Sequence, residues 1–218
     1  MEARDHRNSL WSEMSSDDSR NRVAAGASED AQVLYDRGLI LHARGDREAL
    51  DGAERCWRRA AASGHLDAQY NLGVLCDARG TEESSTEARR WWGRAADAGH
   101  ADAQYILGVQ HHERNEHREA ERWWCRAAAS GHLDSLYNVG VYRFQRGQQA
   151  SARRCWVTAA DAGHADALYA LGAMVHHTEG TAGRDRAAGY WRRAAAAGHV
   201  VARRVLDDLS RLSARKAN

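Results

Sequence analysis

Proline is absent from this 218-residue chain. Turns between its secondary-structure elements must therefore use other residues, and proline-rich linkers are excluded. Lysine is almost absent as well, because Lys216 is the only one, so arginine carries nearly all of the positive charge. The 31 basic and 30 acidic residues leave a net charge of +1, which argues against bulk electrostatic attraction to nucleic acid or to an anionic membrane.

Long hydrophobic runs are also missing. The sequence has no stretch of about 18 apolar residues, and its first residues contain no apolar core of a secretory signal. The four cysteines, Cys56, Cys76, Cys125 and Cys155, form no CxxC pair, so a disulfide framework is not expected. These absences predict a soluble protein of a reducing cytoplasm. The arginine-rich, alanine-rich composition is typical of a high-GC bacterial source.

A repeated phrase dominates the rest of the chain. Gly-His occurs five times with its glycine at positions 64, 99, 131, 163 and 198, so successive phrases are 35, 32, 32 and 35 residues apart. A tyrosine recurs in the same phase, at Tyr35, Tyr70, Tyr105, Tyr137 and Tyr169, and a glycine follows three residues after each. Seven residues before each Gly-His glycine stands a tryptophan, at Trp57, Trp92, Trp124, Trp156 and Trp191. The chain is therefore a tandem array of five units.

Each unit is predicted to contain two helices. Residues 67–80 are typical of the first, called helix A, which ends at a glycine that can adopt positive φ. Residues 85–99 are typical of the second, called helix B, with Ser85 or Thr86 as its N-cap and Glu87 in its first turn. The tryptophan and nearby alanines of helix B share one packed face. The Gly-His glycine then reverses the chain where many helical repeats use proline.

The predicted organisation has three parts. Residues 1–28 are polar, lack the repeat and are expected to be disordered or partly helical, with Trp11 and Met14 available to dock on the first repeat. Residues 29–201 hold the five repeats, at about 31–67, 68–102, 103–134, 135–166 and 167–201. Residues 202–218 form an amphipathic helix that caps the last repeat. Three extra residues are expected between the two helices of the first, second and fifth repeats.

The phrases GHLDAQYNLGVLC, GHADAQYILGVQ, GHLDSLYNVGVY and GHADALYALGAM, with ARRWWGRAADAG, AERWWCRAAASG and AAGYWRRAAAAG, resemble the Sel1-like repeat, a relative of the tetratricopeptide repeat. The resemblance covers residues 31–201. It implies an all-α fold, a right-handed α-solenoid superhelix of five helix–turn–helix repeats. It also implies that helix A lines a concave face on which partner proteins or peptides bind. The third and fourth repeats, of 32 residues, are shorter than usual Sel1-like units and have tetratricopeptide spacing.

One stripe on helix A is the predicted partner-binding site. It combines the repeat tyrosine with a residue seven positions later that varies between repeats, and the two share a helix face. The candidates are Tyr70, Asp77, Tyr105, His112, Tyr137, Phe144, Tyr169 and His176, with His42 in the first repeat. The alternative is that the tyrosines are part-buried signature residues with a structural role. The varied residues are then the better candidates for specificity.

A second stripe, of arginines, follows helix B. Its members stand two residues before or two residues after the tryptophan, on a face that points away from the packed side: Arg55, Arg59, Arg90, Arg94, Arg122, Arg126, Arg154 and Arg193. Such a stripe suits an acidic protein or nucleic-acid phosphate. The favoured alternative, given the near-zero net charge, is a solvated face with local partners such as Glu54, Glu87 and Glu121.

Histidines give a third candidate. The five in Gly-His are predicted to be turn and capping residues. In HHERNEH, the residues His111, His112, Glu116 and His117 have spacings that would place two metal ligands together on a continuous helix. The segment connects helix A to helix B, however, and contains no HExxH.

The chain has no P-loop, no Gly-x-Ser-x-Gly and no dinucleotide fingerprint, so no cofactor and no catalysis are predicted. The favoured function is a non-enzymatic scaffold or adaptor that binds a partner protein or peptide in the concave groove. The alternatives are a metal-binding protein or metal-dependent enzyme that uses residues 111–117, and binding of nucleic acid or an acidic partner by the arginine stripe.

Overall fold

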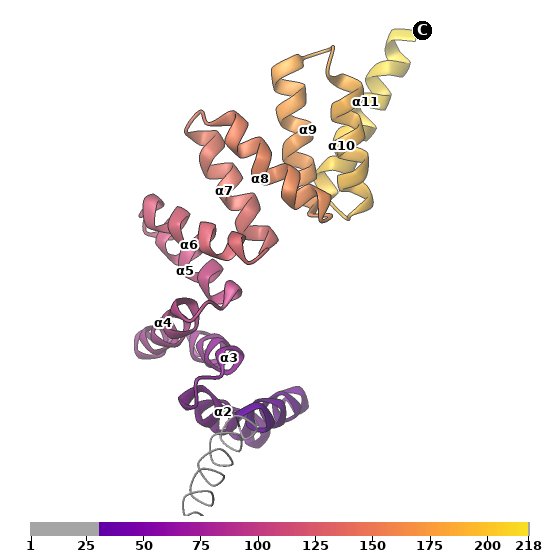
Figure 1. Ribbon diagram of the computed structural model, residues 1–218. Coiled ribbons are helices and arrows are strands. Elements are labelled where there is room, and N and C mark those ends of the chain that lie inside the picture. Colours follow the sequence, from indigo (N-terminus) through magenta and orange to yellow (C-terminus); the bar gives the residue numbers. More distant parts are fainter. Residues whose placement is uncertain (1–30, 218) are drawn as a thin grey trace, which may run out of the picture. The chain divides into compact units, whose positions relative to one another are not determined.

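The computed structural model describes residues 31–217, and the predictions for residues 1–28 lie outside this range. Its regular elements are all helices (Figure 1). The first described helix covers residues 31–44. It is followed by α2 (Arg47–Ala62), α3 (Leu66–Asp77), α4 (Glu82–Asp97), α5 (Ala101–Glu113), α6 (His117–Ala129), α7 (Leu133–Gln145), α8 (Gln149–Asp161), α9 (Ala165–Glu179), α10 (Arg184–Ala196) and α11 (Val200–Ala217). None of the described helices is long and apolar enough to span a membrane.

The chain divides into two compact units, with the boundary after Ala103 in α5. Within the first unit, α3 packs against α4, and α2 packs against α3. Within the second, α7 pairs with α8 and α9 pairs with α10, and each of these pairs lies side by side in Figure 1. Helix α11 packs on α10, as the predicted capping helix should. Each unit is thus a stack of helical hairpins, which is the predicted fold class.

Helix B of the second repeat begins earlier than predicted. Its N-cap is Thr81, whose Oγ1 accepts a hydrogen bond from the backbone N–H of Ser84 at 3.2 Å. The Ser84 hydroxyl in turn accepts one from the backbone N–H of Thr81 at 3.1 Å, which completes a capping box. The prediction of Ser85 or Thr86 as N-cap is wrong, because both lie inside the helix. Two other glutamates, not Glu87, occupy the first turn.

The extra residues of the longer repeats do not lie where they were expected. Helices α2 and α4 have 16 residues, whereas α6 and α8 have 13. In the first two repeats the additional length is therefore within helix B rather than in the connection. In the fifth repeat α10 has 13 residues, and the extra ones fall in α9, which has 15, and in the turn at 180–183.

Left-handed residues replace proline in the turns. The glycines of the five Gly-His pairs have φ between 85° and 100°, a region that side chains other than glycine rarely adopt. Between helices A and B of the third repeat, Asn115 has φ 61° where Gly80 of the second repeat has φ 69°. Asparagine tolerates this conformation better than most residues, so the turn needs no glycine there.

Each repeat buries its tryptophan against the glycine of helix A. The five tryptophans are 3–4% exposed. A Cβ atom on Gly73 would lie 2.3 Å from Nε1 of Trp92, and the corresponding glycines of the other repeats are equally close to their indoles. In four repeats the indole Nε1 also donates to the backbone oxygen of the repeat tyrosine, for example Trp156 to Tyr137 at 3.1 Å. Only a residue without a side chain permits this contact.

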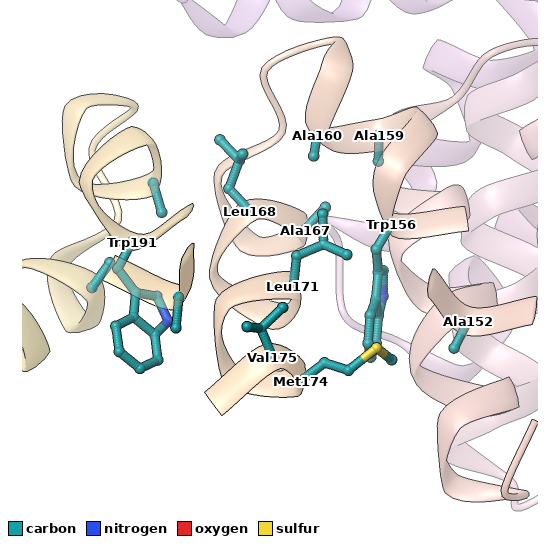
Figure 2. Packing of buried hydrophobic residues seen from close by; sticks show 13 residues of the cluster. Ala152, Trp156, Ala159, Ala160, Ala167, Leu168, Leu171, Met174, Val175 and Trp191 are labelled. Atoms are coloured by element: carbon teal, nitrogen blue, oxygen red, sulfur yellow. The ribbon is translucent and has the colours of Figure 1, made fainter. Parts of the chain in front are cut away.

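Adjoining repeats of the second unit share one core. Figure 2 shows helix α9 between the rings of Trp156 and Trp191, with Leu168, Leu171 and Val175 projecting from it. Leu171 is 1% exposed. Because both tryptophans contact the same cluster, neither hairpin could bury its apolar surface alone, which is why the units occur in tandem.

Candidate functional site

Each Gly-His histidine caps the helix that follows it. The backbone N–H of Ala167 donates to Nδ1 of His164 at 3.2 Å, and the other four histidines do the same for their helices. Because Nδ1 accepts, the ring proton lies on Nε2, which donates to Asp134 Oδ1 of the preceding repeat at 2.8 Å. The predicted capping role is confirmed. The ring also ties two repeats together, which was not predicted.

The repeat tyrosines stack on these histidines. Tyr70 lies 4.8 Å from the His100 ring at an interplanar angle of 13°, and Tyr169 lies 4.4 Å from the His199 ring at the same angle. The predicted site residues Tyr105 and Tyr137 are placed likewise, with centroid distances of 4.8 and 5.5 Å. All four tyrosines are part-buried. One face of each ring is therefore occupied within the chain, and partner binding by these tyrosines stays a prediction.

Burial also raises the pKa of Tyr70, and the carboxylate of Asp102 raises it further. The same two causes, with the aspartate of the next repeat, act on Tyr105 and Tyr137. These phenols therefore remain neutral hydrogen-bonding groups at physiological pH.

The varied residues of the stripe that carry rings lie against the tryptophan of their own repeat. The ring centroids of His112 and Trp124 are 5.6 Å apart, and those of His176 and Trp191 are 5.7 Å apart. Phe144 is placed in the same way, 5.6 Å from the Trp156 ring. Asp77 is exposed in the first unit, as are His112 and His176 in the second. The position thus covers the edge of a buried indole and still faces solvent.

A groove opens between α5 and α7 in the second unit. Its volume is about 270 Å³ and its walls combine aromatic, aliphatic and amide side chains: Val109, His112, Trp124, Asn138, Val141, Tyr142 and Gln145. A chain of rings runs along it, because His117 lies 5.2 Å from His112 and 6.1 Å from Tyr142. This groove brings a predicted site residue, His112, together with residues of the next repeat.

The chemistry of the groove suits a peptide. Its volume lies just below the range of pockets for drug-sized ligands, about 300–1,000 Å³, and fits a single large side chain. The carboxamides of Asn138 and Gln145 offer both donors and acceptors to a peptide backbone. The Asn138 carboxamide also lowers the pKa of the Tyr105 hydroxyl, so that predicted residue lies near the groove's edge.

Four lining residues were missed by the sequence prediction. Asn138, Val141, Tyr142 and Gln145 occupy positions i, i+3, i+4 and i+7 of α7. They share a helix face, and that face turns toward the preceding repeat rather than along the predicted stripe. The predicted residues Tyr137 and Phe144 of the same helix do not line the groove. The recurrence of asparagine directly after the tyrosine, as Asn71 and Asn138, was the available signal.

The candidate metal ligands separate into two pairs. His111 Nδ1 lies 2.6 Å from Glu116 Oε2, while His112 packs beside His117. Helix α5 ends at Glu113 and α6 begins at His117, so the helical spacing on which the hypothesis depended is interrupted. Over residues 31–217 no three His, Cys, Asp or Glu side chains come close enough to hold a metal ion. The metal hypothesis therefore has no structural support.

The arginine stripe on helix B is exposed throughout. Some members contact their own helix: Arg94 lies over the Trp91 ring at 5.0 Å and Arg126 over the Trp123 ring at 4.3 Å. Three others contact a neighbouring group: Arg122 contacts Glu119, Arg154 contacts Ser151, and Arg193 contacts a backbone oxygen. The expected partners Glu54, Glu87 and Glu121 instead bind arginines outside the stripe. That part of the prediction is wrong, and ligand binding by the stripe stays untested.

The first repeat carries the densest group of arginines. Arg37, Arg44, Arg55 and Arg59 line a cavity of about 440 Å³ in the first unit. Two residues after the tyrosine, where Arg37 stands, the second, fourth and fifth repeats have the buried aliphatic residues Leu72, Val139 and Leu171. The first repeat thus presents a charged surface where the others have packed aliphatic side chains.

Comparison with known proteins gives one family. The Sel1 repeat matches residues 31–65, 66–100, 101–132, 133–164 and 165–199. Among solved structures, a Sel1 repeat protein from Oxalobacter formigenes aligns with a TM-score of 0.70 and 23% identity, over 82% of this chain and 76% of that one.

Two further structures share the fold. A protective antigen of uropathogenic Escherichia coli with an SLR fold aligns with a TM-score of 0.69 and 24% identity, over 84% of this chain and 42% of that one. An immunity protein from Pseudomonas aeruginosa aligns with a TM-score of 0.53 and 22% identity, over 79% and 67%. No curated protein matches the chain.

Proposed function

Because the chain belongs to the Sel1 repeat family, whose members are generally protein-interaction scaffolds, we propose that it is a non-enzymatic adaptor that binds a peptide segment of a partner protein in the groove between α5 and α7. The observation that carries this proposal is the groove itself. It joins imidazole, phenol and carboxamide groups to an apolar wall formed by Val109, Val141 and Trp124. Such a combination can bind one side chain of a partner peptide together with the peptide backbone on either side of it.

The lining residues of the groove fall into a buried wall and an exposed rim. Trp124 is 4% exposed and Val109 and Val141 are part-buried, so they form a fixed apolar wall. His112 and Gln145 are exposed at its rim. The wall accounts for the apolar contact, and the rim residues provide hydrogen bonds that discriminate between segments.

The test is a capture experiment with paired variants of the full chain. His112→Ala with Gln145→Ala removes two exposed rim side chains and replaces no buried residue. If each contact contributes about 0.5–1.5 kcal/mol, the affinity for a captured partner falls about fivefold to about 150-fold. The control, Arg154→Ala with Thr158→Ala, changes two exposed residues of α8 that lie outside the groove.

Partners that bind the native chain and the control variant equally, and the groove variant much more weakly, support the proposal. Equal binding of every partner to all three forms would refute it. A partner lost only from the control variant would instead assign binding to helix B.

A further inference from the structure

A polar node lies between repeats in each unit, built from the same sequence positions. In the first unit Arg58 follows the tryptophan of α2 by one residue, and Cys76 follows the tyrosine of α3 by six. In the second unit Cys125 occupies the Arg58 position on α6, and Arg143 occupies the Cys76 position on α7. Arginine and cysteine have thus exchanged places between two equivalent nodes.

The exchange changes what the guanidinium binds. Arg58 contacts two carboxylates, Glu54 at 2.8 Å and Glu87 at 2.6 Å. Among the described residues, Arg143 contacts one carboxylate, that of Glu121 at 3.3 Å. Where the first node has Glu87, five residues before the tryptophan, the second has Ser151, whose Oγ lies 3.4 Å from Nη1 of Arg143. Arg143 therefore has one carboxylate contact fewer than Arg58, which shares Glu54 with Arg79 in the first node.

Two thiols occupy the remaining donors of Arg143. Its Nη1 lies 3.5 Å from Sγ of Cys155 on α8, and its Nη2 lies 3.6 Å from Sγ of Cys125 on α6. Both cysteines also pack against one cluster, formed by Ala120, Trp124 and Val139. Both are part-exposed. One guanidinium therefore contacts the sulfur atoms of two part-exposed cysteines from adjoining repeats.

We propose that Cys125 and Cys155 form a peroxide-reactive dithiol site, in which Cys155 is the attacking sulfur, Cys125 resolves the product and Arg143 positions both. A guanidinium with a single carboxylate partner stabilises a thiolate beside it. The Cys155 thiolate attacks one oxygen of hydrogen peroxide and breaks the O–O bond. The leaving hydroxide takes a proton to become water, and Cys155 becomes a sulfenic acid.

The second step forms the disulfide bond. The Cys125 sulfur attacks the sulfenic sulfur, an S–S bond forms, and the hydroxyl leaves with the Cys125 proton as a second water. The sum is two thiols and one hydrogen peroxide giving one disulfide and two waters, so the thiols are oxidised and peroxide is reduced. Burial raises the pKa of Cys125, and Arg143 opposes that rise. A raised pKa suits the resolving thiol, which stays protonated until the sulfenic acid has formed.

The product links α6 to α8 across α7, the helix that forms one wall of the groove. Its formation requires the Arg143 side chain to leave its place between the sulfurs, since a disulfide brings Cβ atoms within about 3.5–4.5 Å. The inference is independent of the proposed binding function.

The first node supplies an internal control. Cys76 is fully buried, and burial together with Glu87 raises the pKa of its thiol to about 11. It lies beside the Glu87 carboxylate and two glutamate-bound arginines, Arg58 and Arg79. The same chain thus contains, at the equivalent node of the first unit, a thiol that should not react.

The experiment treats the native full chain with hydrogen peroxide, alkylates the remaining thiols and maps them by peptide mass spectrometry. We expect an intramolecular Cys125–Cys155 disulfide to form at a rate on the order of tenfold or more above loss of the Cys76 thiol. In Cys125→Ser, a sulfenic acid should accumulate at Cys155 and react with dimedone.

Arg143→Gln should shift the pH profile of the reaction to higher pH, and Arg143→Lys should restore part of it. This readout separates a positioning role from a merely structural one. Oxidation of Cys155 no faster than that of Cys76, or disulfides that form only between molecules, would overturn the proposal. An unchanged pH profile in Arg143→Gln would remove the role of the arginine.

Discussion

The contact between glycine and tryptophan predicts an unusual cost for adding a methyl group. In Gly73→Ala the new Cβ would lie 2.3 Å from Nε1 and 2.4 Å from Cδ1 of Trp92. Neither the helix backbone nor the buried indole can move away without disturbing its neighbours. Overpacking of this kind costs about 1–3 kcal/mol.

Two smaller effects adjust this figure. A displaced indole loses the hydrogen bond from Nε1 of Trp92 to the Tyr70 oxygen, 3.2 Å long, which contributes about 1 kcal/mol. Alanine in place of glycine inside a helix returns about 1 kcal/mol through propensity. The two nearly cancel, so Gly73→Ala should lower the free energy of unfolding by about 1–3 kcal/mol, the overpacking cost.

A matched control lies in the next helix. Gly93 of α4 is also inside a helix, and a Cβ there would meet no atom within 4 Å. Gly93→Ala should therefore raise stability by about 0.5–1 kcal/mol. Urea unfolding followed by circular dichroism compares the two variants. If Gly73→Ala is as stable as Gly93→Ala, the indole does not need the bare backbone and the reasoning fails.

Two further predictions concern polar contacts between repeats. In His164→Asn the new side chain still caps α9 but loses the bond to Asp134. His164→Ala loses the cap as well, so it should be less stable than His164→Asn by about 1 kcal/mol. Equal losses of the two variants in thermal unfolding would contradict the capping role. The hydrogen bond from Arg58 lowers the pKa of Glu87 to about 2. Its carboxylate therefore stabilises the fold above the unfolded-state pKa of about 4.3, and this contribution is lost as the pH falls toward 2. Glu87→Gln should be less stable than the native chain at pH 6 and equal to it near pH 2, and a stability gap that does not change with pH would show that the carboxylate charge is not used.

The repeat fold was predictable because its signals are redundant. Five tryptophans, five tyrosines and five Gly-His pairs in one phase fixed the helices and their order. The start of α4 was not predictable in the same way, because Thr81, Ser85 and Thr86 are all acceptable caps by type. Only the reciprocal bonds between Thr81 and Ser84 decide between them.

The groove illustrates a different limit. A stripe along one helix can be read from periodicity, which is how His112 was found. The remaining wall, including Asn138 and Gln145, belongs to the next repeat and depends on how the two helices are offset. The Arg143 node was missed for the same reason, since its two cysteines are 30 residues apart in sequence and meet only through an arginine of the helix between them.

Each Gly-His histidine contacts residues on both sides of the turn in which it stands. His164 caps α9, the helix A of the repeat that follows, whereas the aspartate and tyrosine that bind it, Asp134 and Tyr137, lie on α7, the helix A of the repeat before. A segment such as 133–164 therefore carries a complete set of both halves, one at each end. In-frame duplication of that segment by unequal recombination would create a new junction identical to the old one. Lengthening by whole units thus needs no compensating substitution, whereas an insertion of a few residues at the same place would separate the ring from its partners.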